Sequence, residues 1–190
     1  MWPFGRKKTD PAAATETSPA AASVVAADQS GDDTPAVIKV FDPYGREVAI
    51  PRESWRTDVL LPNLEKSKDN PDALYSMIVD SLQNGFAEDL LPFAEHLQKI
   101  SPDPLRGAVI LGIVYLELGR LDEAEGAFRN YLAQHGEQHT EAGLIYTNLA
   151  KVYAARGKES LVEATLWHAL QLDPNQSNGF GWFLARQHQQ

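Results

Sequence analysis

The chain has 190 residues and no cysteine, so a disulfide framework and thiolate metal ligands are both excluded. Its formal net charge is −9, from 17 basic and 26 acidic residues, which disfavours a nucleic-acid partner because phosphate contacts require Lys and Arg. The length suffices for one domain with a proper core, and the lack of cysteine fits a cytoplasmic location.

The first 35 residues are expected to form a disordered tail. Residues 9–35 are rich in Ala, Thr, Ser, Pro and Asp, and their few large apolar side chains cannot offset the entropy of ordering. Residues 1–8 are aromatic and basic, but no apolar segment follows them, so a secretory signal is not expected. A solvated tail is favoured, and weak attachment to anionic lipid through Trp2, Phe4 and the cations is the alternative.

Residues 36–69 are predicted to form a cap that begins with a β-hairpin. Two alternating stretches, residues 37–41 and 46–50, flank the turn residues 42–45. An isolated hairpin is only marginally stable in water, so this one should pack against the helices that follow.

A short helix is predicted after the hairpin. Trp55, Val59 and Leu60 recur at helical spacing, and the helix is expected to end at Pro62. The residues expected to contact the first repeat are Phe41, Ile50 and Trp55.

Residues 70–175 are predicted to form three helical hairpins. Gly85, Gly119 and Gly157 each end one apolar helical stretch and precede another, with a period of 34 and then 38 residues. A fixed period near this length is typical of stacked helical hairpins. The apolar run at residues 107–116 is about half of the ~20 residues needed to cross a bilayer, and it indicates a buried helix.

Several of these helices carry recognisable start signals. Asn70 and Asp103, each followed by proline, are expected to cap helix N-termini, and Thr140 is expected to do the same without proline. Pro92 falls inside the second helix of the first hairpin, which should therefore kink or start late.

The middle hairpin resembles the tetratricopeptide repeat (TPR) family. The residues that match the family pattern are Leu111, Gly112, Tyr115, Gly119, Ala124 and Phe128. The third hairpin is similar at Tyr146, Leu149, Ala150, Tyr153, Gly157, Ala169 and Pro174, and the first at Gly85, Leu97 and Pro102. A longer resemblance links residues 41–46 and 173–176 to bacterial TPR proteins with an aromatic, Gly-rich segment before the repeats.

The resemblance implies a mainly α fold, a short α-solenoid of three TPR hairpins at about residues 70–103, 104–138 and 140–175. The N-terminal β-hairpin with its short helix precedes them, and a C-terminal capping helix and tail over residues 176–190 follows. In such repeats Gly112 stands where two helices cross closely, so a bulky side chain there should overpack the crossing.

In this family the first helix of each repeat lines a concave peptide-binding groove, and helical spacing gives the positions. They are Tyr75, Val79, Leu82, Arg106, Val109, Ile113, Leu116, Thr147, Asn148 and Lys151. A partner's amphipathic helix or extended peptide could occupy the groove, or the chain's own N-terminal hairpin and helix could fill it. Some relatives hold acidic tails with a Lys, Asn and Arg clamp, with which only Asn148 agrees here.

No pattern of catalytic, cofactor-binding or metal-binding residues is found. His135 and His139 lie four residues apart, but a zinc-protease pair requires a continuous helix, and Gly136 interrupts this segment. The chain is therefore predicted not to be an enzyme and to need no cofactor or metal.

The sequence favours a non-catalytic scaffold or adaptor that binds a protein or peptide partner in the groove. The alternative is an accessory factor for a membrane or envelope complex, weakly tethered through residues 1–8. Neither a nucleic acid nor a membrane is the expected partner, and a homo-oligomer through the aromatic side chains of Phe180, Trp182 and Phe183 is left open.

Overall fold

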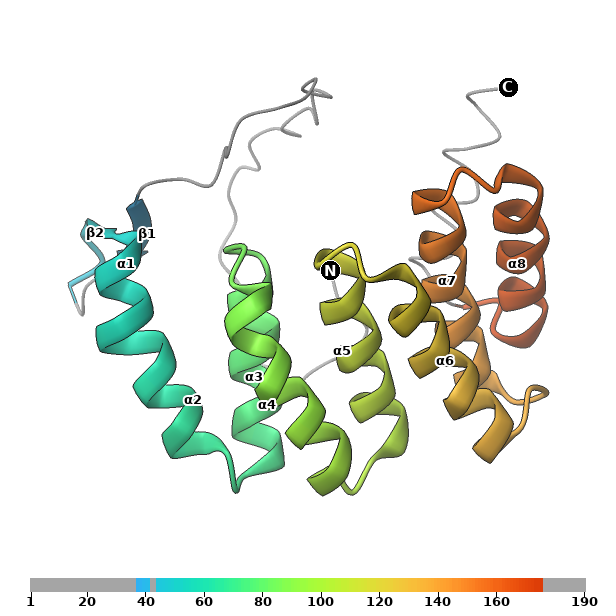
Figure 1. Ribbon diagram of the computed structural model, residues 1–190, viewed down its shortest axis with the longest axis horizontal. Coiled ribbons are helices and arrows are strands. Elements are labelled where there is room, and N and C mark those ends of the chain that lie inside the picture. The colour runs from blue at the N-terminus through green and yellow to red at the C-terminus, as the bar shows by residue number, and fades with distance from the viewer. Residues whose placement is uncertain (1–36, 42–43, 176–190) are drawn as a thin grey trace, which may run out of the picture. The chain divides into compact units, whose positions relative to one another are not determined.

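The computed structural model describes residues 37–41 and 44–175, which belong to one compact unit (Figure 1). The expected tail over residues 1–35 and the expected capping helix over residues 176–190 lie outside the described residues. The fold is mainly helical, and a short two-stranded sheet precedes the helices.

The predicted hairpin is present. Strands β1 (Val37–Phe41) and β2 (Glu47–Pro51) pair antiparallel, with Val37 opposite Pro51 and Phe41 opposite Glu47. Ile38 is 5% exposed and joins a core cluster with residues of the helices that follow. The hairpin therefore gains the apolar contact that two strands need in water.

The helix after the hairpin does not end at Pro62, so that prediction was wrong. Helix α1 (Arg52–Trp55), the π-helical segment η1 (Arg56–Leu60) and α2 (Leu61–Ser67) follow one another without a break. Pro62 therefore lies inside a continuous helix, and the wider π turn directly before it replaces the regular i→i−4 bonding that proline interrupts. We call residues 37–67, from β1 to α2, the cap segment.

Within residues 71–172, six further helices form three pairs, and a tight turn joins the two helices of each pair. The turn glycines Gly85, Gly119 and Gly157 have φ values of 72°, 68° and 66°, which favour glycine because it has no Cβ. Within each pair the two helices pack together, and each pair packs against the next. The pairs are α3 (Pro71–Leu82) with α4 (Ala87–Ile100), α5 (Pro104–Glu117) with α6 (Leu121–His135), and α7 (Thr140–Ala155) with α8 (Glu159–Leu172).

The helix starts follow the sequence signals in two of three cases. The Asn70 side chain accepts from the N–H groups of Asp72 and Ala73, and Asp103 caps α5 in the same way. Thr140 is the first helical residue of α7 and makes no capping bond, because His139 occupies the extended N-cap position. The Thr140 prediction was therefore wrong.

Pro92 does not delay the start of its helix. Helix α4 begins at Ala87 and runs through Pro92 to Ile100. Pro92 is exposed, so the carbonyl group left without an N–H donor one turn earlier faces the solvent side of the helix.

The cores of the repeats depend on close helix contacts. A Cβ atom added to Gly112 would lie 2.9 Å from Cε2 of Phe128 and closer still to Cε1 and Cζ of that ring. Phe128 is fully buried, so its ring holds α6 directly against the backbone of α5. This contact agrees with the close crossing predicted at Gly112.

Candidate partner-binding surface

The first helices of the three pairs lie in one row, because α3 contacts α5 and α5 contacts α7. The row brings together the predicted groove positions, which we call the first-helix face. Its ten residues are Tyr75, Val79 and Leu82 on α3, Arg106, Val109, Ile113 and Leu116 on α5, and Thr147, Asn148 and Lys151 on α7.

Six of the ten residues retain partial exposure. They are Tyr75, Val79, Leu82, Arg106, Leu116 and Lys151. This set combines aliphatic side chains with an aromatic ring and two cations. A surface of this composition suits a partner that carries apolar and acidic groups.

The other four residues of the first-helix face are buried. Val109 is 2% exposed, Ile113 5%, Thr147 2% and Asn148 1%. The Thr147 hydroxyl donates to the Gly143 carbonyl at 3.0 Å, one turn earlier on the same helix. Buried side chains of this kind support the row of helices and offer little area to a partner.

Asn148 is also committed to bonds within α7. Its side-chain amide donates to the Leu144 carbonyl at 2.9 Å, and its Oδ1 accepts from Nζ of Lys151 at 3.2 Å. Asn148 was the one residue that agreed with the carboxylate clamp of some relatives. Because Asn148 is 1% exposed and one of its two amide N–H groups donates within α7, it is not placed to bind a partner's carboxylate.

Arg106 links the first two repeats across the first-helix face. Its guanidinium forms an ion pair with Asp72 and lies over the Tyr75 ring, 4.8 Å from the centroid. The Arg106 side chain is 24% exposed, whereas that of Asp72 is 82% exposed. Burial raises the pKa of Tyr75, and the nearby Arg106 cation opposes that rise. The cation is thus held in place between α3 and α5.

Lys151 provides the second cation of the first-helix face. Burial lowers the pKa of its ammonium group, and the Glu117 carboxylate of α5 opposes this effect. Removing an ammonium group from water is costly, so a negatively charged neighbour favours its charged form. Acidic partner groups would strengthen the same effect.

The cap segment packs at the α3 end of the row (Figure 1). Arg52 donates to the carbonyls of Asn84 and Gly85, and its guanidinium lies 4.0 Å from the centroid of the Phe86 ring. Arg56 forms two hydrogen bonds of 2.8 Å with the Asp89 carboxylate. These contacts join the cap segment to the turn and start of α4 rather than to the middle of the first-helix face.

The two histidines between the second and third repeats surround a tyrosine. His135 is exposed and stacks on the Tyr131 ring at 4.7 Å, and the His139 ring lies 6.1 Å from it. Among the residues that the structure describes, no group of three or more His, Cys, Asp or Glu side chains could hold a metal ion.

The paired helices and the first-helix face define a protein with a tetratricopeptide-type helical-repeat fold. No family model matches the chain. Over 87 residues, 45% of the chain, it is 33% identical to Protein O-mannosyl-transferase Tmtc3 of Drosophila melanogaster, of which the match covers 9%. It is also similar to the solved structure of MamA MSR-1 C2, with a TM-score of 0.49, 20% identity, and coverage of 64% of this chain and 67% of that one.

Within residues 37–41 and 44–175, no helix is both long enough and apolar enough to cross a membrane.

Proposed function

We propose that this chain is a non-catalytic scaffold that binds a protein partner along the first-helix face. The partner segment is an amphipathic helix or an extended peptide that combines apolar side chains with acidic ones. The observation that carries the proposal is the row formed by α3, α5 and α7, on which Arg106 and Lys151 stand among partly exposed aliphatic residues. A cytoplasmic location would suit such an adaptor.

The partly exposed positions that would supply apolar contact are Val79, Leu82 and Leu116. Arg106 would supply orientation, because its guanidinium is already held between Asp72 and the Tyr75 ring. A cation fixed before binding loses less conformational entropy when a carboxylate docks. An acidic partner group would displace the mostly exposed Asp72 side chain from its ion pair with Arg106.

Site-specific photocrosslinking tests this proposal. A photoreactive phenylalanine analogue replaces Leu116 on the first-helix face, and in a matched variant it replaces Gln134, an exposed residue of α6. The expected result is a discrete adduct from position 116 that weakens when Arg106→Glu is added, and no such adduct from position 134. Equal labelling from both positions, or labelling that ignores Arg106→Glu, would contradict the proposal.

The alternative function, an accessory factor of a membrane or envelope complex, depends on residues 1–8, which lie outside the described part of the chain. Flotation with anionic vesicles separates the two functions. The tether requires the full chain to float and a variant lacking residues 1–8 to remain in the dense fraction. If both float equally, the tether is excluded.

A further inference from the structure

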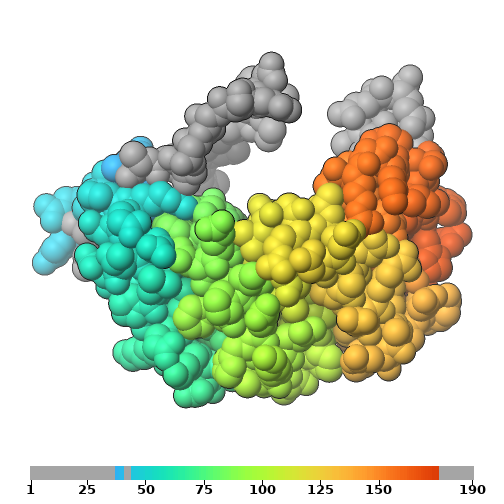
Figure 2. All heavy atoms as spheres, in the orientation of Figure 1, coloured from blue at the N-terminus to red at the C-terminus, as the bar shows by residue number. Residues whose placement is uncertain are grey.

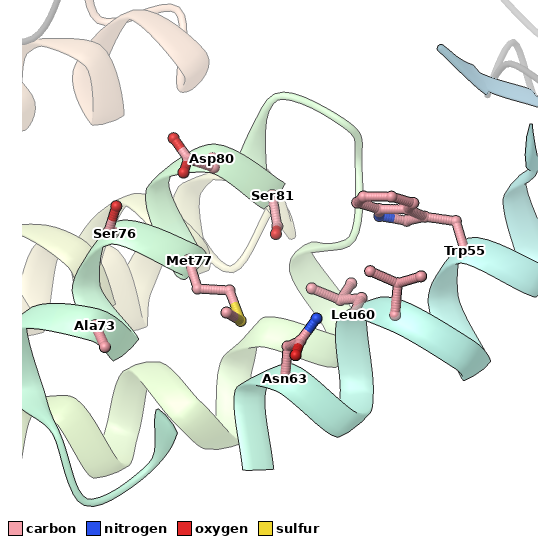
Figure 3. A pocket seen from close by; sticks show the side chains of 9 residues that line it. Trp55, Leu60, Asn63, Ala73, Ser76, Met77, Asp80 and Ser81 are labelled. Atoms are coloured by element: carbon pink, nitrogen blue, oxygen red, sulfur yellow. The ribbon is translucent and has the colours of Figure 1, made fainter. Parts of the chain in front are cut away.

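A surface hollow lined by none of the residues of the first-helix face lies between the cap segment and the first repeat (Figure 3). Its volume is about 300 Å³. Trp55 and Leu60 stand on the side of the cap segment, and Ala73 and Met77 stand on the side of α3. The complete lining is Trp55, Val59, Leu60, Asn63, Ala73, Ser76, Met77, Asp80 and Ser81.

Polar contacts hold the two walls of this hollow in place. Arg56 of the cap segment forms its two hydrogen bonds with Asp89 of α4, and Arg52 donates to the carbonyls of Asn84 and Gly85. The two arginines thus anchor the cap segment to the turn after α3 and to the first turn of α4. Trp55 and Val59, which remain only partly buried, are left to line an open space.

The π-helical segment η1 contributes to the same wall. It supplies Val59 and Leu60, and Asn63 follows from the first turns of α2. A π turn changes the angle between successive side chains, and such turns are found frequently at functional sites. The π-helical segment thus presents two apolar side chains to the hollow, and α2 adds a polar amide.

The chemistry of the lining selects the kind of ligand. The lining combines an aromatic ring, aliphatic side chains and the thioether of Met77, and its one charged residue is Asp80. Within residues 37–41 and 44–175, the exposed Asp80 carboxylate forms no ion pair. A volume at the lower end of the ~300–1,000 Å³ range of ligand pockets holds a large side chain but not a whole helix.

We propose that this hollow binds one aromatic side chain of a partner peptide, and that Asp80 binds a lysine or arginine next to it in that peptide. Trp55 and Met77 contact the aromatic ring from opposite walls, as ring stacking and sulfur–ring contact favour. The carboxylate at the rim adds selectivity for a basic neighbour. This site differs from the first-helix face in position and in the charge that it prefers.

Methionine NMR of the full chain tests the proposal directly. The sequence contains two methionines, Met1 and Met77, so ¹³C-methyl labelling gives a reporter inside the hollow that Met77→Leu assigns. The probe is the amidated, acetylated pentapeptide Gly-Lys-Trp-Lys-Gly. Ring currents from a bound tryptophan should shift the Met77 methyl signal upfield in a saturable titration.

Two matched peptides and one variant separate the two parts of the proposal. Alanine in place of tryptophan should abolish the shift, and glutamate in place of both lysines should weaken binding. Exposed ion pairs contribute modestly, so Asp80→Lys should weaken the lysine peptide by about fivefold and strengthen the glutamate peptide. Asp80 is exposed, so this variant preserves the fold.

Three results would overturn the proposal. The first is an unchanged Met77 signal at millimolar peptide, and the second is an equal shift with the alanine peptide. The third is a Met77 shift that follows protein concentration without peptide, since a second copy of the chain would then be the occupant. Unaltered peptide preference in Asp80→Lys would overturn the assignment of the cation site.

Discussion

Replacing Gly112 with alanine tests the closest helix contact in the repeats. Alanine alone would stabilise an exposed helix by about 1 kcal/mol relative to glycine. Here the new Cβ would meet the Phe128 ring within 2.9 Å of Cε2 and nearer still to two other ring atoms. The ring is fully buried and cannot swing into solvent. Overpacking costs ~1–3 kcal/mol, so Gly112→Ala should lower the free energy of unfolding by about 1–2 kcal/mol net.

Gly126 provides a matched control within the same helical pair. It lies inside α6, and a Cβ added there meets nothing within 4 Å. Gly126→Ala should therefore stabilise the chain by up to ~1 kcal/mol through helix propensity alone. The two variants make the same chemical change and are expected to move stability in opposite directions.

Thermal unfolding followed by circular dichroism measures the difference. For a chain of this length 1 kcal/mol corresponds to ~2–4 °C in Tm, so Gly112→Ala should melt several degrees below the parent and Gly126→Ala slightly above it. Adding Phe128→Leu to Gly112→Ala should cost less than the sum of the two single changes, because the smaller side chain relieves the clash. Equal melting temperatures for the two alanine variants would refute the assigned contact.

Three further predictions concern other parts of the chain. Ile113→Glu should lower the free energy of unfolding by several kcal/mol because the Ile113 side chain is 5% exposed, whereas Leu116→Glu should change it little. Similar melting temperatures for the two variants would contradict this difference in burial. Burial, and to a lesser extent a hydrogen bond to the Glu141 carboxylate, raises the pKa of Tyr131 from 10.0 to about 12. The stability that the protonated Tyr131 hydroxyl contributes is therefore complete below pH 10 and is lost as the pH rises toward 12. In Tyr131→Phe the free energy of unfolding should depend less on pH between 10 and 12 than in the parent chain. An unaltered pH dependence would contradict the raised pKa of Tyr131. Asp89→Asn should weaken the hydrogen bonds to Arg56 and raise the rate of amide hydrogen exchange in the cap segment more than in the repeats. An unchanged rate in the cap segment would show that this pair does not anchor it.

The helical pairs could be predicted because their signals are local. A glycine at the end of each first helix and a capping Asn70 or Asp103 are each recognised within one turn of the chain, and the repetition of the glycines after 34 and then 38 residues indicates the pairs. The close helix crossing at Gly112 could also be predicted from the repeat pattern, but the sequence did not identify Phe128 as the residue that fills it. The resulting turns and helix crossing agree with those predictions.

Where the predictions were wrong, local signals competed with a neighbouring feature. Pro62 was expected to end a helix, but the helix continues through it, and the π turn directly before it replaces the regular bonding that proline interrupts. Thr140 resembled an N-cap, but the extended residue before it starts α7. Neither outcome can be read from residue preference alone, because each depends on the backbone of adjacent residues.

The candidate surfaces were only partly accessible from the sequence. Helical spacing identified the side of α5 that carries Ile113 and Leu116, but it could not show that Ile113 is buried and Leu116 is not. The hollow between the cap segment and α3 was missed altogether. Its walls depend on the pairing of Arg56 with Asp89 across 33 residues, and no periodicity indicates such a contact.

Hydrogen–deuterium exchange tests the central claim most directly, when the chain alone is compared with its non-covalent complex with the partner identified by photocrosslinking. If the first-helix face binds the partner, protection should increase in α3, α5 and α7, and α6 and α8 should exchange at their unbound rates. Arg106→Glu should remove that protection without changing exchange in the free chain. Protection confined to α6 and α8 would contradict a binding function for the first-helix face.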